Sequence, residues 1–135
     1  MSSMDVEALE QEATEALRRA GARFAFVHGS RAGTAAPWAT PPRPDSDLDV
    51  AAWWGREAPA PWDVGGSGGH IDLLVLDNAP LELAGRVAVW GRLLFDDDPP
   101  ARVAWQAQTM KVYLDECDRR KELSRVFLRE RARGR

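Results

Sequence analysis

The sequence is poor in the features that mark secreted, membrane-spanning and nucleic-acid-coating proteins. It has a single cysteine, Cys117, which excludes an internal disulfide and is consistent with a reducing compartment. No apolar run approaches the ~20 residues of a transmembrane helix, and the start MSSMDVEALEQE is acidic, unlike a signal peptide. The net charge of −3 argues against a protein that coats nucleic acid, because that requires clustered cations. We therefore expect a cytoplasmic protein without membrane contact, for which direct nucleic-acid binding is not favoured.

What is present is the composition of an ordinary globular protein, with 44% hydrophobic and 29% charged residues. The length of 135 residues fits one domain over positions 1–135. Apolar periodicity and turn residues predict the order α-β-β-β-α-β-α, which indicates an α/β (α+β) fold with a small mixed sheet and flanking helices. The predicted helices span about 4–20, 81–91 and 100–131, the last a C-terminal extension, and the predicted strands about 23–27, 48–54, 70–76 and 92–95.

Three aspartates stand at the starts of two predicted strands. Asp47 and Asp49 are separated by one residue, so on a strand they point to the same side, roughly 7 Å apart. Asp72 begins the next strand and approaches this pair if the two strands are neighbours. Like charges repel unless a cation lies between them, and Mg²⁺ prefers carboxylate and phosphate oxygens. A D-x-D near a strand start is by itself more often a solvated turn, so the metal-site interpretation depends on its combination with a second motif.

That second motif is Gly29-Ser30, directly after the first predicted strand. A glycine lets the backbone come close to a phosphate, and a serine that opens a helical turn offers its hydroxyl and N–H groups to an anion. The dipeptide alone says little. Together with the aspartates it predicts a site for a metal-bound nucleotide.

In this order the motifs resemble the minimal nucleotidyltransferases of the DNA polymerase β superfamily, in particular the MntA-type antitoxins that pair with HEPN-domain toxins. The resemblance covers roughly residues 22–115 and rests on GSRA (29–32), SDLDV (46–50) and HIDLLV (70–75). It implies a polymerase β-like nucleotidyltransferase core. It also implies that Gly29, Ser30 and Arg31 bind the nucleotide triphosphate, and that Asp47, Asp49 and Asp72 bind the metal ions and act in catalysis.

The resemblance further implies a function: Mg²⁺-dependent transfer of AMP from ATP to a tyrosine of a cognate HEPN ribonuclease toxin, with two ions at the site. This sequence departs from the family in two places. Residues 31–46 form a longer, proline-rich insertion, and Gly33 stands where a second arginine is common. A non-catalytic antitoxin that masks its toxin therefore stays an alternative. A small-molecule nucleotidyltransferase is the third interpretation, less favoured because only one predicted helix follows the core.

The C-terminal segment KELSRVFLRERARGR (121–135) mixes apolar residues with many arginines. Leu123, Phe127 and Leu128 recur at helical spacing beyond the predicted core. The segment either packs on the sheet, binds a helix of a partner protein or contacts RNA. We favour contact with a partner.

Overall fold

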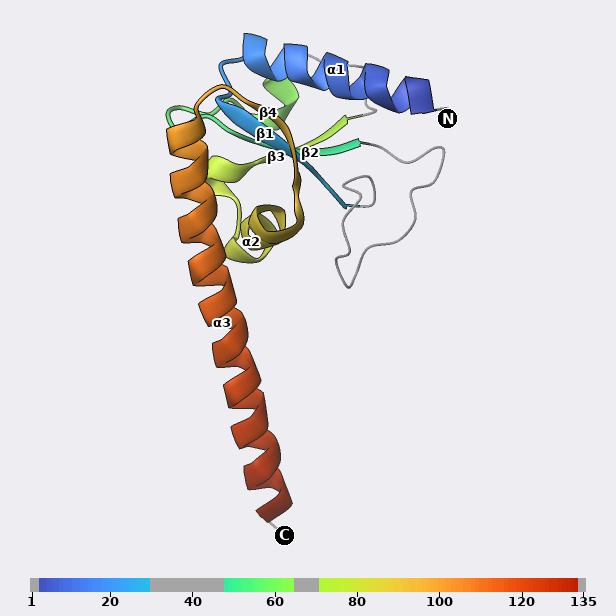
Figure 1. Ribbon diagram of the computed structural model, residues 1–135. Helices are drawn as coiled ribbons and strands as arrows, with labels where there is room; N and C mark the ends of the chain where they lie inside the picture. The colour runs from blue at the N-terminus through green and yellow to red at the C-terminus, as the bar shows by residue number, and fades with distance from the viewer. Residues whose placement is uncertain (1–2, 30–47, 65–70, 134–135) are drawn as a thin grey trace.

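A computed structural model describes residues 3–29, 48–64 and 71–133 and places a four-stranded sheet between helices (Figure 1). The strands and helices follow one another in the predicted order α-β-β-β-α-β-α, with two short 3₁₀ turns in addition. The fold class is confirmed: a small mixed sheet, flanking helices and a long C-terminal helix. The elements are α1 (Ser3–Arg19), β1 (Phe24–His28), β2 (Leu48–Trp53), the 3₁₀ turn η2 (Pro61–Asp63), β3 (Ile71–Val75), the 3₁₀ turn η3 (Leu76–Asn78), α2 (Leu81–Trp90), β4 (Arg92–Asp96) and α3 (Pro99–Arg133).

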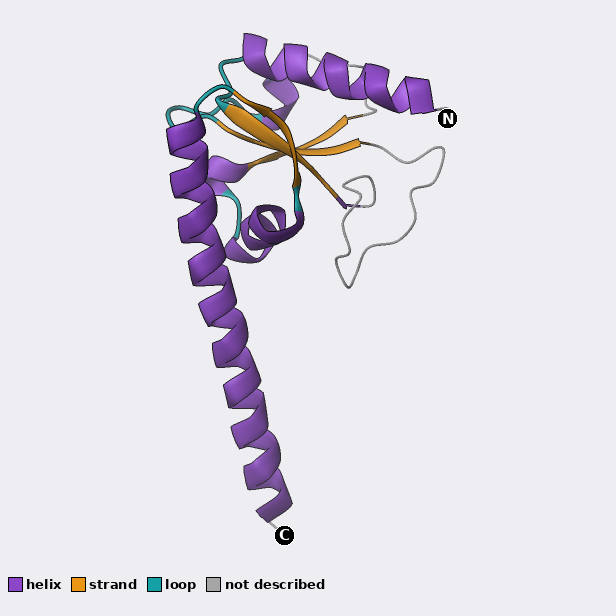
Figure 2. Cartoon of the chain, in the orientation of Figure 1, coloured by secondary structure: helices purple, strands orange, loops and turns teal. Residues whose placement is uncertain are grey.

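The strands, drawn in orange in Figure 2, form one sheet. Their order in this sheet is β3-β2-β1-β4. Strand β1 is antiparallel to both β2 and β4, whereas β2 and β3 are parallel. In a parallel pair both strands start at the same edge of the sheet. The beginnings of β2 and β3, and the end of the antiparallel β1, therefore share one edge.

The sheet is covered on both faces, because α1 lies on one side and α2 and the first part of α3 on the other (Figure 1). Alternation along each strand sorts its residues between these faces. In β2, Leu48 and Val50 pack with Leu17 of α1, while Ala51 packs with the α2 side chain Val87. Asp49 has the same parity as Ala51 and so lies on the α2 side of the sheet.

Helix α1 ends where the sequence predicts. Gly21 follows it with a φ of +94°, a backbone conformation that glycine adopts without strain. The Gly21 N–H and the Ala22 N–H donate to the carbonyls of Arg18 and Leu17 in the last turn. The chain then reverses into β1.

The aspartates after β4 connect α1, β1 and α3. Asp98 accepts a hydrogen bond from the Ala101 N–H at 3.3 Å, so it caps the first turn of α3. The Arg18 guanidinium binds the Asp97 carboxylate through two 2.9 Å hydrogen bonds, and Arg23 binds Asp98 at 3.0 Å. The ion pairs of this turn thus hold together elements that are distant in sequence.

Helix α3 is much longer than the body of the protein it packs against, and its second half runs away from the sheet (Figure 1). Tyr113 is its one buried residue, and Glu116 and Cys117 are half-buried. Every residue from 118 to 133 is exposed. The interpretation of the C-terminal segment as packed on the sheet is therefore wrong. No helix in the described part of the chain is long and apolar enough to cross a membrane.

Candidate active site

Asp49 and Asp72 lie directly beside each other. They are register partners in the parallel pair of β2 and β3, so both side chains project from the same face of the sheet. Asp49 is half-buried and Asp72 is exposed. Adjacent strands are about 4.8 Å apart, so two negative charges are held close together at the edge of the sheet.

Gly29 approaches the first of these carboxylates closely. It follows β1 with a φ of +72°, and a Cβ built on it would lie 2.5 Å from the Asp49 Oδ2 atom. Any larger residue would therefore strain the backbone and displace the carboxylate. Only glycine allows the Asp49 carboxylate to lie this close to the backbone at the end of β1.

His28 completes this cluster from β1. It is the register partner of Asp49 in the antiparallel pair, so its imidazole lies on the same face as the two aspartates. Burial lowers the pKa of His28, while the charges of Asp49 and Asp72 and a backbone hydrogen bond with Val50 oppose that shift. Its Nε2 atom is buried and has no hydrogen-bond partner among the residues that the structure describes. The sequence gives little reason to single out this histidine; only the strand register brings it beside Asp49.

Asp77 holds the far ends of the same two strands together, another contact that the sequence motifs do not identify. Its carboxylate accepts hydrogen bonds from the Trp54 N–H at 3.0 Å and from the Gly55 N–H at 2.7 Å. Asp77 lies in η3, just after β3, and the two N–H groups follow β2. This contact fixes the relative positions of β2 and β3, and with them the register of Asp49 and Asp72.

The remaining predicted site residues, Ser30, Arg31 and Asp47, lie outside the described residues. Within the described ranges no group of three or more His, Cys, Asp or Glu side chains is arranged to hold a metal ion. The structure thus brings Gly29, Asp49 and Asp72 together, and a three-carboxylate site depends on Asp47. The donor chemistry fits Mg²⁺, because Asp49 and Asp72 offer hard oxygen ligands side by side at the same edge of the sheet.

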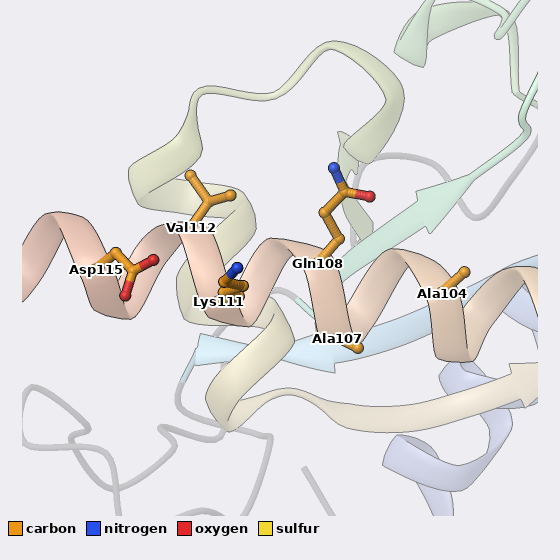
Figure 3. Close-up of a pocket in the computed structure, with 6 residues that line it drawn as sticks. All are labelled: Ala104, Ala107, Gln108, Lys111, Val112 and Asp115. Carbon is orange, nitrogen blue, oxygen red and sulfur yellow. The ribbon is translucent and has the colours of Figure 1, made fainter.

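A surface depression of about 500 Å³ lies elsewhere, on the side of α3 (Figure 3). All of its lining residues come from this one helix, and none belongs to the Asp49–Asp72 cluster. It is shallow and has no group of converging polar side chains, so we assign it no chemistry. The lining residues are Ala104, Ala107, Gln108, Lys111, Val112 and Asp115.

No model of a known protein family matches the chain, and no curated protein matches its sequence. Solved structures do match. A crystal structure of the toxin–antitoxin complex MntA–HepT, carrying two aspartates one residue apart replaced by glutamate, aligns with a TM-score of 0.65 and 15% identity, over 87% of this chain and 98% of that chain. The chain has the fold of an MntA antitoxin.

Two other matches to the MntA fold are related complexes. A toxin–antitoxin structure with AMP-PNP aligns with a TM-score of 0.63 and 17% identity, over 87% of this chain and 98% of that chain. A complex of tri-AMPylated Shewanella oneidensis HEPN toxin with MNT antitoxin aligns with a TM-score of 0.62 and 16% identity, over 90% and 98% of the two chains. These alignments therefore span nearly all of the matched chains and most of this one.

Proposed function

We propose that this chain is a Mg²⁺-dependent nucleotidyltransferase antitoxin that transfers AMP from ATP to a tyrosine of a cognate HEPN toxin in the cytoplasm and so neutralises it. The observation that carries the proposal is the direct pairing of Asp49 with Asp72 beside Gly29, within the fold of an MntA antitoxin. Two facts about the matched complexes support it. One contains the ATP analogue AMP-PNP, and another contains a HEPN toxin that is already AMPylated.

Asp47, Asp49 and Asp72 are the residues that would hold Mg²⁺. Asp49 and Asp72 are adjacent through the strand register, and Asp47 shares the parity of Asp49 in the sequence. When bound, a pair of such ions stabilises both the attacking and the leaving oxygens of a phosphoryl-type transfer. The chain contributes the carboxylates and the rigid sheet edge that orients them.

Gly29, Ser30 and Arg31 would bind the triphosphate. Without a Cβ, the Gly29 backbone lies directly against the Asp49 carboxylate, so phosphates bound at this turn would lie close to a proposed metal ligand. The serine hydroxyl and the arginine guanidinium following it in the sequence supply hydrogen bonds and positive charge to the same phosphates.

The transfer forms one bond and breaks one. The acceptor tyrosine oxygen bonds to the α-phosphorus of ATP, the bond from that phosphorus to the bridging oxygen breaks, and pyrophosphate leaves with the bonding electrons. Asp72 is the more exposed of the two described carboxylates and so the more accessible to an incoming acceptor, and we assign it the hydroxyl proton. Half-buried Asp49 stays a metal ligand.

One sequence feature favours a second candidate, an antitoxin that neutralises by binding alone. Gly33 removes a cation expected near the phosphates. A small-molecule nucleotidyltransferase has less support, because α3 is the only helix after β4 in the described chain and the matched structures are toxin complexes.

Labelled ATP separates these candidates. The chain is incubated with Mg²⁺, a HEPN-type toxin and ATP that carries ³²P in either the α- or the γ-phosphate. AMP transfer moves only the α label to the partner, and Asp49→Asn abolishes it, whereas Glu12→Gln, an exposed carboxylate on α1 across the sheet, leaves it unchanged. Label from the γ-phosphate on the partner, or none from either while the toxin is inhibited, contradicts AMP transfer.

A further inference from the structure

The free half of α3, residues 118–133, is an exposed helix with its own apolar side chains. Sixteen residues at 1.5 Å each reach about 24 Å past the last half-buried residue, Cys117. Four large apolar side chains on it are between 42% and 62% exposed: Leu123, Val126, Phe127 and Leu128. A helix that only needed to end the domain has no reason to extend such residues into water.

Two of these residues continue the face by which α3 already binds a helix. In the packed half, Gln106 donates a hydrogen bond to the Ala88 carbonyl of α2, and the Tyr113 ring lies against Gly85. Seven residues later, Arg120 lines the small space at the start of α2 with Leu81. Phe127 is the next position in this seven-residue series, and Leu123 lies one turn before it.

The packing of α2 on the first half of α3 therefore shows how a second helix can pack on the free half. The two helices are antiparallel, since Leu81 at the start of α2 lies near Arg120 and Ala88 lies near Gln106. Leu81 and Leu83 at the start of α2 are themselves 37% and 42% exposed. A second helix placed end to end with α2 would cover Phe127 and Leu123 and contact the start of α2.

The charge of the free half identifies the chemistry of that helix. Residues 118–133 contain seven Arg or Lys and three Asp or Glu, although the whole chain has a net charge of −3. The arginines pair only loosely within the helix: the Arg119–Glu116, Arg120–Glu116 and Arg125–Glu122 ion pairs span 3.8 to 3.9 Å and are exposed. Two free halves from two copies would repel each other, whereas an acidic surface is attracted.

We propose that residues 118–133 form a docking arm for an acidic amphipathic helix of the partner protein, packed on Leu123 and Phe127 as a continuation of the α2–α3 contact. Because the partner meant here is the HEPN toxin, the inference rests on the proposed function. The arm extends on the side of the sheet covered by α2, which is also the side from which Asp49 and Asp72 project (Figure 1). A partner held there lies on the same side as the carboxylates.

The test measures affinity by calorimetry between the HEPN-type protein and an Asp49→Asn chain, in which transfer cannot change the partner. Leu123→Ala with Phe127→Ala weakens binding on the order of 100-fold, as expected when two central apolar contacts are removed. The matched control Leu114→Ala, 44% exposed on a different side of α3, changes binding less than about threefold. Binding of the unsubstituted arm also falls as salt rises.

Several results overturn the docking arm. The first is that the double variant binds the HEPN protein with unchanged affinity, and the second is that the unsubstituted chain does not bind this protein. The third is that the chain alone forms a dimer and the double variant is a monomer. If the double variant loses binding to a 20-nucleotide single-stranded RNA while its affinity for the HEPN protein is unchanged, the arm binds RNA and not the toxin. If the double variant loses affinity but the unsubstituted chain transfers no AMP, the docking arm is supported and the proposed enzymatic activity is not. If the unsubstituted chain transfers AMP but the double variant binds with unchanged affinity, the activity is supported and the docking arm is not.

Discussion

Asp49 and Asp72 are direct neighbours across the parallel strands β2 and β3, with both carboxylates on the face that α2 covers. A pair of like charges facing each other across a sheet destabilises the folded protein by about 0.2–1 kcal/mol. Such an arrangement is a disadvantage for folding unless a cation binds there. The pair therefore makes a prediction about stability that is independent of catalysis.

Asp72→Asn is expected to raise the free energy of unfolding by about 0.5 kcal/mol in EDTA, because it removes the repulsion with Asp49. In the unsubstituted chain, Mg²⁺ at about 100 times its dissociation constant adds about 2.7 kcal/mol, and the variant loses most of this gain. Urea unfolding with and without Mg²⁺ measures both effects. Equal Mg²⁺ stabilisation of the two proteins would show that the ion binds elsewhere.

Gly29→Ala is expected to abolish Mg²⁺-dependent ATP binding. Its φ of +72° costs about 1–2 kcal/mol with a Cβ present, and that Cβ would lie 2.5 Å from Asp49 Oδ2. The matched control is Gly21→Ala, which has a similar φ of +94° but whose Cβ meets nothing closer than the Trp54 ring at 3.8 Å. Both variants lose similar stability, and fluorescent-ATP titration should show that only Gly29→Ala loses binding. Loss of ATP binding in both variants, or in neither, would contradict this prediction.

Gly85→Ala tests the contact between α2 and α3. Alanine in a helix normally stabilises by about 1 kcal/mol over glycine. Here a Cβ would collide with the Tyr113 ring, so we expect destabilisation by about 1–3 kcal/mol instead. Urea unfolding measures this change, and we expect a lower midpoint for the variant. A higher midpoint would mean that Tyr113 does not pack against α2 as described.

Asp97 predicts a specific acid sensitivity. The hydrogen bond from Arg18 lowers the pKa of Asp97, so its ionised form stabilises the fold above its unfolded pKa of about 3.9, and this contribution is lost as the pH falls through the lower folded pKa. Asp97→Asn should therefore be less stable than the unsubstituted chain at pH 7, with the difference shrinking below about pH 4. Urea unfolding at pH 7 and pH 3 measures this. The control Asp118→Asn replaces an exposed carboxylate, and its difference in stability from the unsubstituted chain should not depend on pH in this way.

The sequence predicts most of the fold because its apolar periodicity is regular. Helix α1 and the four strands are found within a few residues of their predicted bounds. Strand parity also correctly predicts that Asp49 and Asp72 share a face if β2 and β3 pair.

Three features depend on contacts between distant residues, which periodicity does not contain. The register that sets Asp72 opposite Asp49, rather than two residues away, comes from strand pairing and from the Asp77 contact with the end of β2. His28 enters the cluster only because β1 runs antiparallel to β2. The free half of α3 has apolar spacing much like that of a packed helix, so only the structure shows that nothing in the described chain covers it.

The intact mass of the HEPN-type partner, after incubation with this chain, Mg²⁺ and ATP, tests the central claim most directly. We expect the mass to rise by one or more AMP units, and expect no rise with Asp47→Asn or Asp49→Asn, since each removes a proposed metal ligand at the edge of the sheet. The same variants should still bind the partner. An unchanged partner mass with the unsubstituted chain, while the toxin is fully neutralised, would contradict the enzyme and leave an antitoxin that acts by binding.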